Sequence, residues 1–150
     1  MIAIDTNILV YSHRKDSTFY KAAFSKLKQL AESGFDWAIP WPCIHEFISV
    51  VTHPKIYKTP SSNDQVIQQI EIWMESPTLR LLGEGDHYWN KLRTFVCLEK
   101  VKGSIIHDAR IAAICLESGV TSLWTADRDF SMFPGVRIQN PLNGASSISP

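Results

Sequence analysis

The sequence lacks the features that would place it in a membrane or send it through one. Its 150 residues contain no apolar run of the roughly 18 residues that a helix needs to cross a bilayer. The apolar start at residues 1–12 has no basic leader and is interrupted by Asp5 and Asn7, which argues against a signal peptide. We therefore expect a cytoplasmic protein that makes no use of a membrane.

Cysteine is scarce, and none of the three residues stands in a metal-binding spacing. Cys43, Cys97 and Cys115 lie far apart among apolar neighbours, with no CxxC pair and no histidine cluster beside them. This pattern argues against both a disulfide framework and a zinc site. We expect all three cysteines to be small, buried apolar residues.

The chain also lacks internal repeats, low-complexity segments and an obvious domain linker. Its length is that of one domain, and 45% hydrophobic with 20% charged residues is an ordinary composition for a globular protein. We expect a single domain that spans residues 1–150.

Short apolar runs alternate with amphipathic stretches along the chain. The apolar runs predict strands at residues 1–4, 35–40, 78–83, 122–126 and 136–138. Apolar residues spaced three and four apart predict helices at residues 18–34, 43–52, 64–75, 85–101 and 105–119. This alternation favours an α/β fold, in which a central parallel sheet is covered by helices on both faces.

Five acidic residues stand where such a fold would bring them to one edge of the sheet. Asp5 ends the first predicted strand, and Asp127 and Asp129 follow a later one. Asp108 lies in the first turn of the helix that precedes that later strand, and Glu46 lies near the start of another helix. Because ligands of these sheets bind beyond the carboxyl ends of the strands, we expect the five carboxylates to converge.

Each acid alone has an ordinary structural alternative. Asp5 could cap the turn after its strand, Asp108 could complement a helix N-terminus, and Asp127 could cap a short turn. Together the acids would repel one another unless a cation neutralised them, and a set of oxygen ligands suits Mg²⁺ or Mn²⁺. Asn7 and Thr125 could orient metal-bound groups by hydrogen bonding, although turns and strands use the same residue types.

Four short motifs stand in order along the chain: "IDTNILVY" at 4–11, "EF" at 46–47, "HDARIAA" at 107–113 and "TADRDF" at 125–130. They resemble the PIN domain family and, within it, the VapC-type ribonuclease toxins of bacterial toxin–antitoxin systems. The resemblance covers essentially the whole chain, although residues 53–104 match no motif. It implies a three-layer α/β/α sandwich and an endoribonuclease that depends on Mg²⁺ or Mn²⁺. It also implies a homodimer and inhibition by a small cognate antitoxin.

The resemblance further implies roles for the acids. The residues that match the motifs form a catalytic quartet, namely Asp5, Glu46, Asp108 and Asp127. Asp129 is an additional acid at the same site, and Asp5 and Asp108 are the expected direct metal ligands. Asn7 and Thr125 match the polar helpers of the family.

Basic and aromatic side chains outside the acidic motifs could hold a nucleic acid. Arg14 is expected shortly after the first strand, and a loop that bears two prolines carries Lys55, Tyr57 and Lys58. Basic groups hold phosphates and aromatic rings stack on unpaired bases, so the expected substrate is single-stranded RNA. Simple solvation of surface loops is the alternative. Arg128 is expected either to buttress its own loop or to meet a phosphate.

Two other functions are compatible with part of this pattern. A phosphatase with an aspartate nucleophile also places an aspartate after its first strand beside Mg²⁺. Such enzymes usually carry a second aspartate two residues later, where this chain has Asn7, and a lysine ahead of the late acids, which is missing here. The other alternative is a non-catalytic module that binds RNA or a protein partner, against which the complete acidic set argues.

Overall fold

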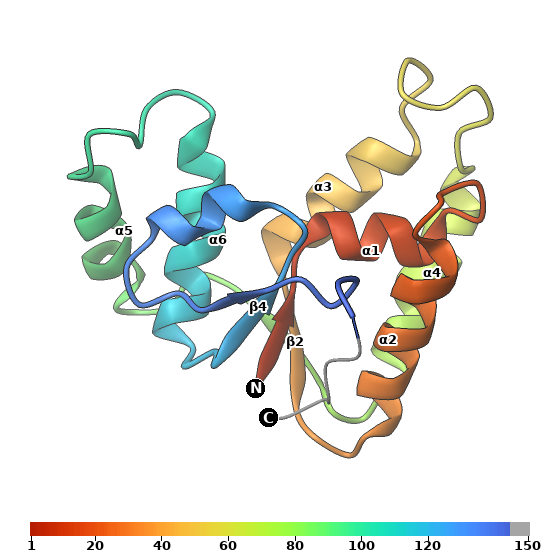
Figure 1. Ribbon diagram of the computed structural model, residues 1–150, viewed down its shortest axis with the longest axis horizontal. Coiled ribbons are helices and arrows are strands. Elements are labelled where there is room, and N and C mark those ends of the chain that lie inside the picture. Colours follow the sequence, from red (N-terminus) through yellow and green to blue (C-terminus); the bar gives the residue numbers. More distant parts are fainter. Residues whose placement is uncertain (145–150) are drawn as a thin grey trace.

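The computed structural model describes residues 1–144 and contains one parallel β-sheet between layers of helices (Figure 1). The strands are β1 (Ile2–Ile4), β2 (Trp37–Pro40), β3 (Leu79–Leu82), β4 (Ser122–Trp124) and β5 (Ile138–Gln139). They lie in the order β3-β2-β1-β4-β5, and every neighbouring pair is parallel. The first strand therefore lies at the centre of the sheet, beside a strand from near the end of the chain.

The helices are α1 (Thr6–His13), α2 (Tyr20–Glu32), α3 (Trp41–Val51), α4 (Asn63–Met74), α5 (Tyr88–Val96) and α6 (Ile105–Glu117), with a short 3₁₀ helix η1 (Arg128–Met132). In Figure 1, α1, α2 and α4 stand on one side of the sheet, and α5 and α6 stand on the other. Helix α3 extends from the carboxyl end of β2. The three-layer α/β/α sandwich with a central parallel sheet is thus confirmed.

Helix α1 is an element that the sequence patterns do not predict, and it corrects the expected position of Arg14. Asp5 is the N-cap of this helix, because its carboxylate accepts a hydrogen bond from the backbone N–H of Thr6 at 2.8 Å. The apolar residues 8–10 are consecutive and all buried, so they carry no helical spacing that a pattern could reveal. Arg14 therefore follows α1 and not the first strand.

The other predicted elements are present with shifted ends. Helix α3 begins at Trp41, earlier than predicted. Pro42 is tolerated in its first turn, because a backbone N–H at that position would have no partner within the helix. Helix α5 is shorter than predicted at both ends. The residues before it form a loop in which the backbone N–H groups of Gly85 and His87 donate to the Glu117 carboxylate at 3.0 and 2.7 Å. A contact so distant in the sequence leaves no trace in local spacing.

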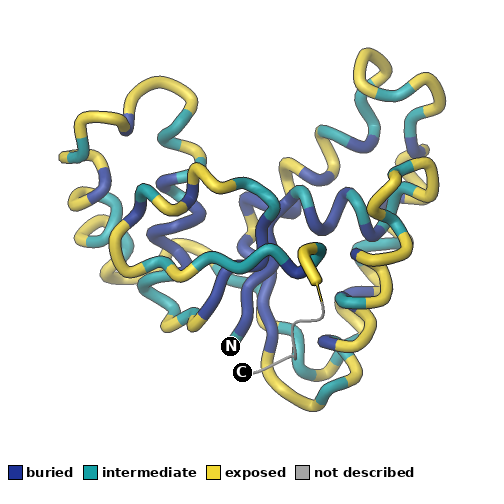
Figure 2. Tube along the Cα trace, viewed as in Figure 1, coloured by how far each residue is buried: buried dark blue, intermediate teal, exposed yellow. Residues whose placement is uncertain are grey.

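The central strands are buried on both faces, as Figure 2 shows in dark blue. Cys43 and Cys115 are buried in this core as expected. The prediction is wrong for Cys97, which is exposed and lies at the C-cap of α5. No helix in the described part of the chain is long and apolar enough to cross a membrane.

Candidate metal centre

Four acidic side chains from four different segments line one cavity of about 300 Å³. Asp5 directly follows β1 and Asp127 lies just beyond β4, and the parallel pairing of these two strands brings both acids to the same edge of the sheet. Asp108 lies in the first turn of α6, and Glu46 projects from α3. The structure thus brings together the four acids that the motifs single out.

Asp5 is the most firmly held of the four acids, with only 4% of the residue exposed. Its Oδ1 accepts a hydrogen bond from the Thr6 backbone N–H at 2.8 Å. Its Oδ2 accepts two more, from Asn7 Nδ2 at 2.8 Å and from Thr125 Oγ1 at 2.7 Å. The Cys43 thiol lies 3.8 Å from Oδ1. These contacts fix the carboxylate in one orientation at the floor of the cavity.

Asn7 and Thr125 connect Asp5 to the loop after β4. Asn7 Nδ2 also donates to Thr125 Oγ1 at 3.0 Å, and Asn7 Oδ1 accepts from the backbone N–H of Ala126 at 3.0 Å. Thr125 Oγ1 accepts in turn from the backbone N–H of Asp127 at 3.0 Å. One hydrogen-bond network therefore positions Asp5 and Asp127 relative to each other. This geometry fits the supporting role predicted for Asn7 and Thr125.

Glu46 is held by a hydroxyl group that no sequence pattern singles out. Thr6 Oγ1 donates to Glu46 Oε2 at 2.9 Å. Thr6 is 6% exposed and is the first residue of α1, so the start of this helix contacts Asp5 through its backbone and Glu46 through its side chain. The only trace of this role in the sequence is the place of Thr6 between two predicted site residues.

Burial and mutual repulsion alter the titration of the acids. Burial raises the pKa of Asp5 from 3.8 to about 6, although the hydrogen bonds that it accepts act in the opposite direction. The pKa of Asp108 is also raised to about 6, first by burial and then by nearby carboxylates, that of Asp127 foremost. The fully ionised set is therefore unfavourable until positive charge enters the cavity.

The two acids of the TADRDF segment differ in their surroundings. Asp127 lines the cavity, and its Oδ1 also accepts from the Asp129 backbone N–H at 2.8 Å, which makes Asp127 the N-cap of η1. The capping alternative for Asp127 is therefore correct as well. Asp129 is exposed and does not line the cavity, but its charge helps to raise the pKa of Asp108. Arg128 is exposed, and within residues 1–144 it makes no hydrogen bond or ion pair that would buttress the loop.

The donor groups around the cavity are those that a hard divalent cation prefers, namely carboxylate, hydroxyl and amide oxygens. Burial raises the pKa of the Cys43 thiol well above its usual value, so this sulfur stays protonated and is a poor ligand. Among the described residues, no group of three or more acidic, histidine or cysteine side chains is already arranged to hold an ion.

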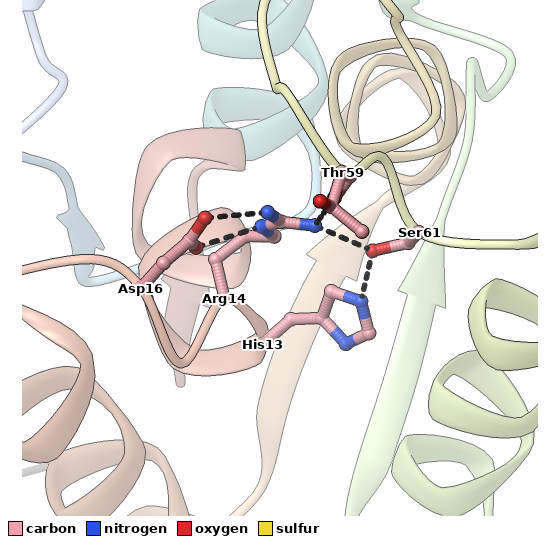
Figure 3. Close-up of polar contacts among 5 residues, drawn as sticks. All are labelled: His13, Arg14, Asp16, Thr59 and Ser61. Carbon is pink, nitrogen blue, oxygen red and sulfur yellow. Dashed lines mark hydrogen bonds and ion pairs between the residues drawn. The ribbon is translucent and has the colours of Figure 1, made fainter.

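The side chains predicted to contact RNA lie in three different settings. Tyr57 lines the acidic cavity. Lys55 and Lys58 are exposed on the loop between α3 and α4, drawn in yellow in Figure 1. Arg14 instead lies in a polar network, with 11% of its side chain exposed (Figure 3). Four of the five guanidinium N–H groups of Arg14 donate within the protein, which leaves little capacity for the predicted phosphate contact.

Comparison with known proteins identifies the class to which this fold and this acidic cavity belong. The family model described as "PIN domain" matches residues 2–135, and the chain belongs to this family. It is similar to Ribonuclease VapC48 of Mycobacterium tuberculosis, with 30% identity over 141 residues, 93% of this chain and 97% of the relative. It is also similar to Ribonuclease VapC43 of the same organism, with 30% identity over 148 residues, 99% of this chain and 100% of the relative.

A solved structure supports the same fold. The toxin–antitoxin complex from Klebsiella pneumoniae contains a chain that matches with a TM-score of 0.59 and 19% sequence identity. The match covers 94% of this chain and 98% of that chain. At this level of identity the comparison establishes the fold alone.

Proposed function

We propose that this chain is a metal-dependent endoribonuclease and the toxin component of a type II toxin–antitoxin system. The observation that carries the proposal is the single cavity into which β1, α3, α6 and the loop after β4 each contribute a carboxylate. Two of these carboxyl groups have a pKa raised to about 6, as expected for a site built to hold positive charge. The ribonuclease names of the similar full-length proteins support the same function.

The proposed cofactor is Mg²⁺ or Mn²⁺, because oxygen atoms dominate the polar lining of the cavity. Asp5 and Asp108 are the proposed direct ligands, with Asp127 and Glu46 completing the site and Asp129 as an additional acid nearby. When bound, the divalent ion lowers the pKa of a water and stabilises the negative charge that builds up on the phosphate.

Glu46 is the proposed acceptor of the proton from the attacking water. Thr6 holds its Oε2, while Oε1 accepts no hydrogen bond from a described residue and is free to face substrate. The water oxygen adds to phosphorus, the bond to the leaving ribose oxygen breaks, that oxygen takes a proton from solvent, and Glu46 later returns its proton to solvent. Asp5, fixed by three hydrogen bonds, would hold the divalent ion in a set position relative to Glu46.

The proposed partners are single-stranded RNA as substrate, a second copy of the chain, and a small antitoxin. Support for the antitoxin comes from the Klebsiella chain, whose structure is that of a toxin–antitoxin complex. Because RNA and the antitoxin would be met in the cytoplasm, we propose that the protein acts there. Growth arrest on expression, relieved by Asp108→Asn or by the neighbouring reading frame, would support the toxin assignment.

Cleavage of RNA by the purified protein tests the proposal directly. We expect cleavage with Mg²⁺ or Mn²⁺, loss of cleavage in EDTA, and recovery when excess Mn²⁺ is added. Asp108→Asn should abolish cleavage, whereas Asp36→Asn should leave it unchanged, because Asp36 is an exposed acid paired with Arg80. Cleavage that persists in EDTA or in the Asp108→Asn variant would contradict the proposal.

A small phosphate ester offered in the same assay separates the phosphatase alternative. The second aspartate that such a phosphatase usually carries is Asn7 in this chain, and its side-chain amide donates a hydrogen bond to Asp5 at 2.8 Å. Hydrolysis of the ester with the RNA left intact would nevertheless favour the phosphatase. Tight RNA binding without cleavage under every ionic condition would favour the binding module.

A further inference from the structure

Arg14 joins the end of α1 to residues 52–62, here called the α3–α4 loop. Its Nη1 donates to the Thr59 carbonyl at 3.0 Å and to Ser61 Oγ at 3.2 Å. Its Nε and Nη2 donate to the two carboxylate oxygens of Asp16 at 2.9 and 2.6 Å, which fixes the plane of the guanidinium. Figure 3 shows these contacts running from the Arg14 side chain to Asp16 on one side and to Thr59 and Ser61 on the other.

The same guanidinium covers one face of the Tyr57 ring. Arg14 Cζ lies 3.9 Å from the ring centroid, within the range of a cation–π interaction. Tyr57 is half-buried, packs against the core and lines the acidic cavity. Its neighbours Lys55, Ile56 and Lys58 are exposed. Tyr57 is therefore the member of the α3–α4 loop that lines the site.

His13 supports the attachment of the loop. Its Nδ1 lies 3.1 Å from Gln69 Oε1, and its Nε2 lies 2.9 Å from Ser61 Oγ. Because an amide oxygen only accepts, Nδ1 carries the hydrogen and Nε2 accepts from the Ser61 hydroxyl. Burial lowers the pKa of His13, which favours this neutral form. Ser61 is thus held from α1 by two adjacent side chains, those of His13 and Arg14.

Few backbone hydrogen bonds hold the second half of the loop. The Tyr57 N–H donates to the His53 carbonyl at 3.1 Å, and the next such bond in the described chain runs from the Ser61 N–H to the Val51 carbonyl at 2.8 Å. Between these two points, Pro60 has no N–H to offer. Side-chain contacts from α1 therefore hold the segment that follows Tyr57, and one of the same side chains, Arg14, also covers the Tyr57 ring.

Beside the acids and the polar Thr6 and Asn7, the cavity is lined by apolar and aromatic side chains. The apolar and aromatic residues are Val10, Tyr11, Val50, Tyr57 and Phe130. A nucleotide also combines two parts, a charged phosphate and a flat base. A base within a duplex is already paired and stacked, so only an unpaired base can turn toward such a surface.

We propose that Arg14 is a positioning residue that holds Tyr57 in the cavity lining, where the Tyr57 side chain contacts the unpaired base next to the phosphate that is cut. This inference rests on the proposed endoribonuclease function and identifies how the substrate is recognised. In this proposal Arg14 acts through Tyr57 and not as an RNA contact, because Asp16, Thr59 and Ser61 take up four of its five N–H donors.

RNA binding in an Asp108→Asn background tests the role of Tyr57 without cutting the RNA. The probe is a short single-stranded RNA that the wild-type protein cleaves, compared with the same RNA annealed to its complement, by fluorescence anisotropy. Tyr57→Leu should weaken binding of the single strand by about 5- to 100-fold, the effect of removing a base-stacking ring, and leave duplex binding unchanged. Tyr57→Phe retains the ring and should bind as the parent does.

The link between Arg14 and Tyr57 is tested by a double-mutant cycle in the same background. Arg14→Ala should weaken single-strand binding, and Arg14→Ala should add no further loss when Tyr57→Leu is already present. Arg14→Lys, which retains the charge but not the planar fork, should fall between Arg14→Ala and the parent. The control Arg80→Ala removes an arginine paired with exposed Asp36 at 3.1 Å and should change nothing.

Each outcome decides the matter. Losses that add in the double variant, or an Arg14→Ala protein that binds like the parent, overturn the positioning role. Should Arg14→Ala fail to fold in a thermal unfolding control, Arg14→Lys carries the same test.

In the active enzyme, both Tyr57→Leu and Arg14→Lys should raise KM with little change in kcat. If the wild type cleaves no RNA, the proposed function fails; if it cleaves but Tyr57→Leu binds normally, only this inference fails.

Discussion

Replacing Asp108 by asparagine should make the metal-free protein more stable while removing its activity. Asp108 accepts no hydrogen bond from a described residue, and its pKa is raised to about 6 by burial and by the carboxylates around it. Asparagine has the same shape without the charge. The substitution therefore removes repulsion from Asp127 and Glu46 and breaks no hydrogen bond within the described chain.

The expected size of this stabilisation follows from the titration of Asp108. A pKa raised from 3.8 to about 6 sets a ceiling of roughly 3 kcal/mol, at about 1.4 kcal/mol for each pKa unit. Water reaches this half-buried carboxyl group and screens part of the repulsion, so we expect about 1 to 2 kcal/mol. For a chain of 150 residues this corresponds to a rise in Tm of about 2 to 8 °C.

The pH dependence of the effect has a definite sign. The folded-state pKa of Asp108 lies above the unfolded value of 3.8, so its favourable contribution is complete below 3.8 and is lost as the pH rises through about 6. The wild type and Asp108→Asn should therefore melt at similar temperatures near pH 3.8. Their melting temperatures should differ most at a pH above about 6.

Thermal unfolding in EDTA and in excess Mn²⁺ is the assay. In EDTA above pH 6 the Asp108→Asn variant should melt above the wild type, and Mn²⁺ should raise the Tm of the wild type far more than that of the variant. Asp36→Asn, which removes an exposed acid, should respond to Mn²⁺ as the wild type does. The reasoning is refuted if Asp108→Asn melts below the wild type in EDTA, or if both gain equally from Mn²⁺.

The two remaining predictions concern the hydrogen bonds of the site. Asp5→Asn should destabilise the protein, unlike Asp108→Asn, because the new amide nitrogen must face a hydrogen-bond donor whichever way the side chain is turned. Thermal unfolding in EDTA should show that the free energy of unfolding falls by about 1 to 3 kcal/mol. Stability equal to or greater than that of the wild type would contradict this. Thr125→Val removes the donor to Asp5 and the acceptor for the Asp127 N–H, so RNA cleavage should fall by about 10- to 100-fold. Thr125→Ser retains both and should stay active, so equal activity of the two Thr125 variants would be the adverse result.

Much of the sheet and of the candidate site can be predicted from the sequence, because strand ends and helix starts are local features. Asp5 ends an apolar run, and Asp127 follows another, so the rule that ligands bind at the carboxyl edge of a parallel sheet suffices to predict their convergence. Helix α1 escapes prediction because its buried apolar residues, 8–10, are consecutive. The exposed Cys97 escapes because its apolar neighbours suggest a longer α5 than the chain forms.

The contacts of individual side chains are a different matter. Arginine is a residue type that often contacts phosphates. Only the bonds of Arg14 to Asp16, Thr59 and Ser61 reveal that most of its donors are used within the protein. Thr6 lies within the IDTNILVY motif, yet only the structure shows that its hydroxyl holds Glu46. In both cases the residue type permits several roles, and the neighbours in space select one.

The sequence by itself determined the kind of fold, the family and the acids at the strand ends, because each depends on residue types at short spacing or at the ends of elements. Tertiary structure alone decided how the site is held. Thr6 reaches Glu46 40 residues away, and Asn7 reaches Thr125 118 residues away. Burial and repulsion across these distances set the pKa of Asp5 near 6, and such effects depend on separation in space, which residue spacing does not encode.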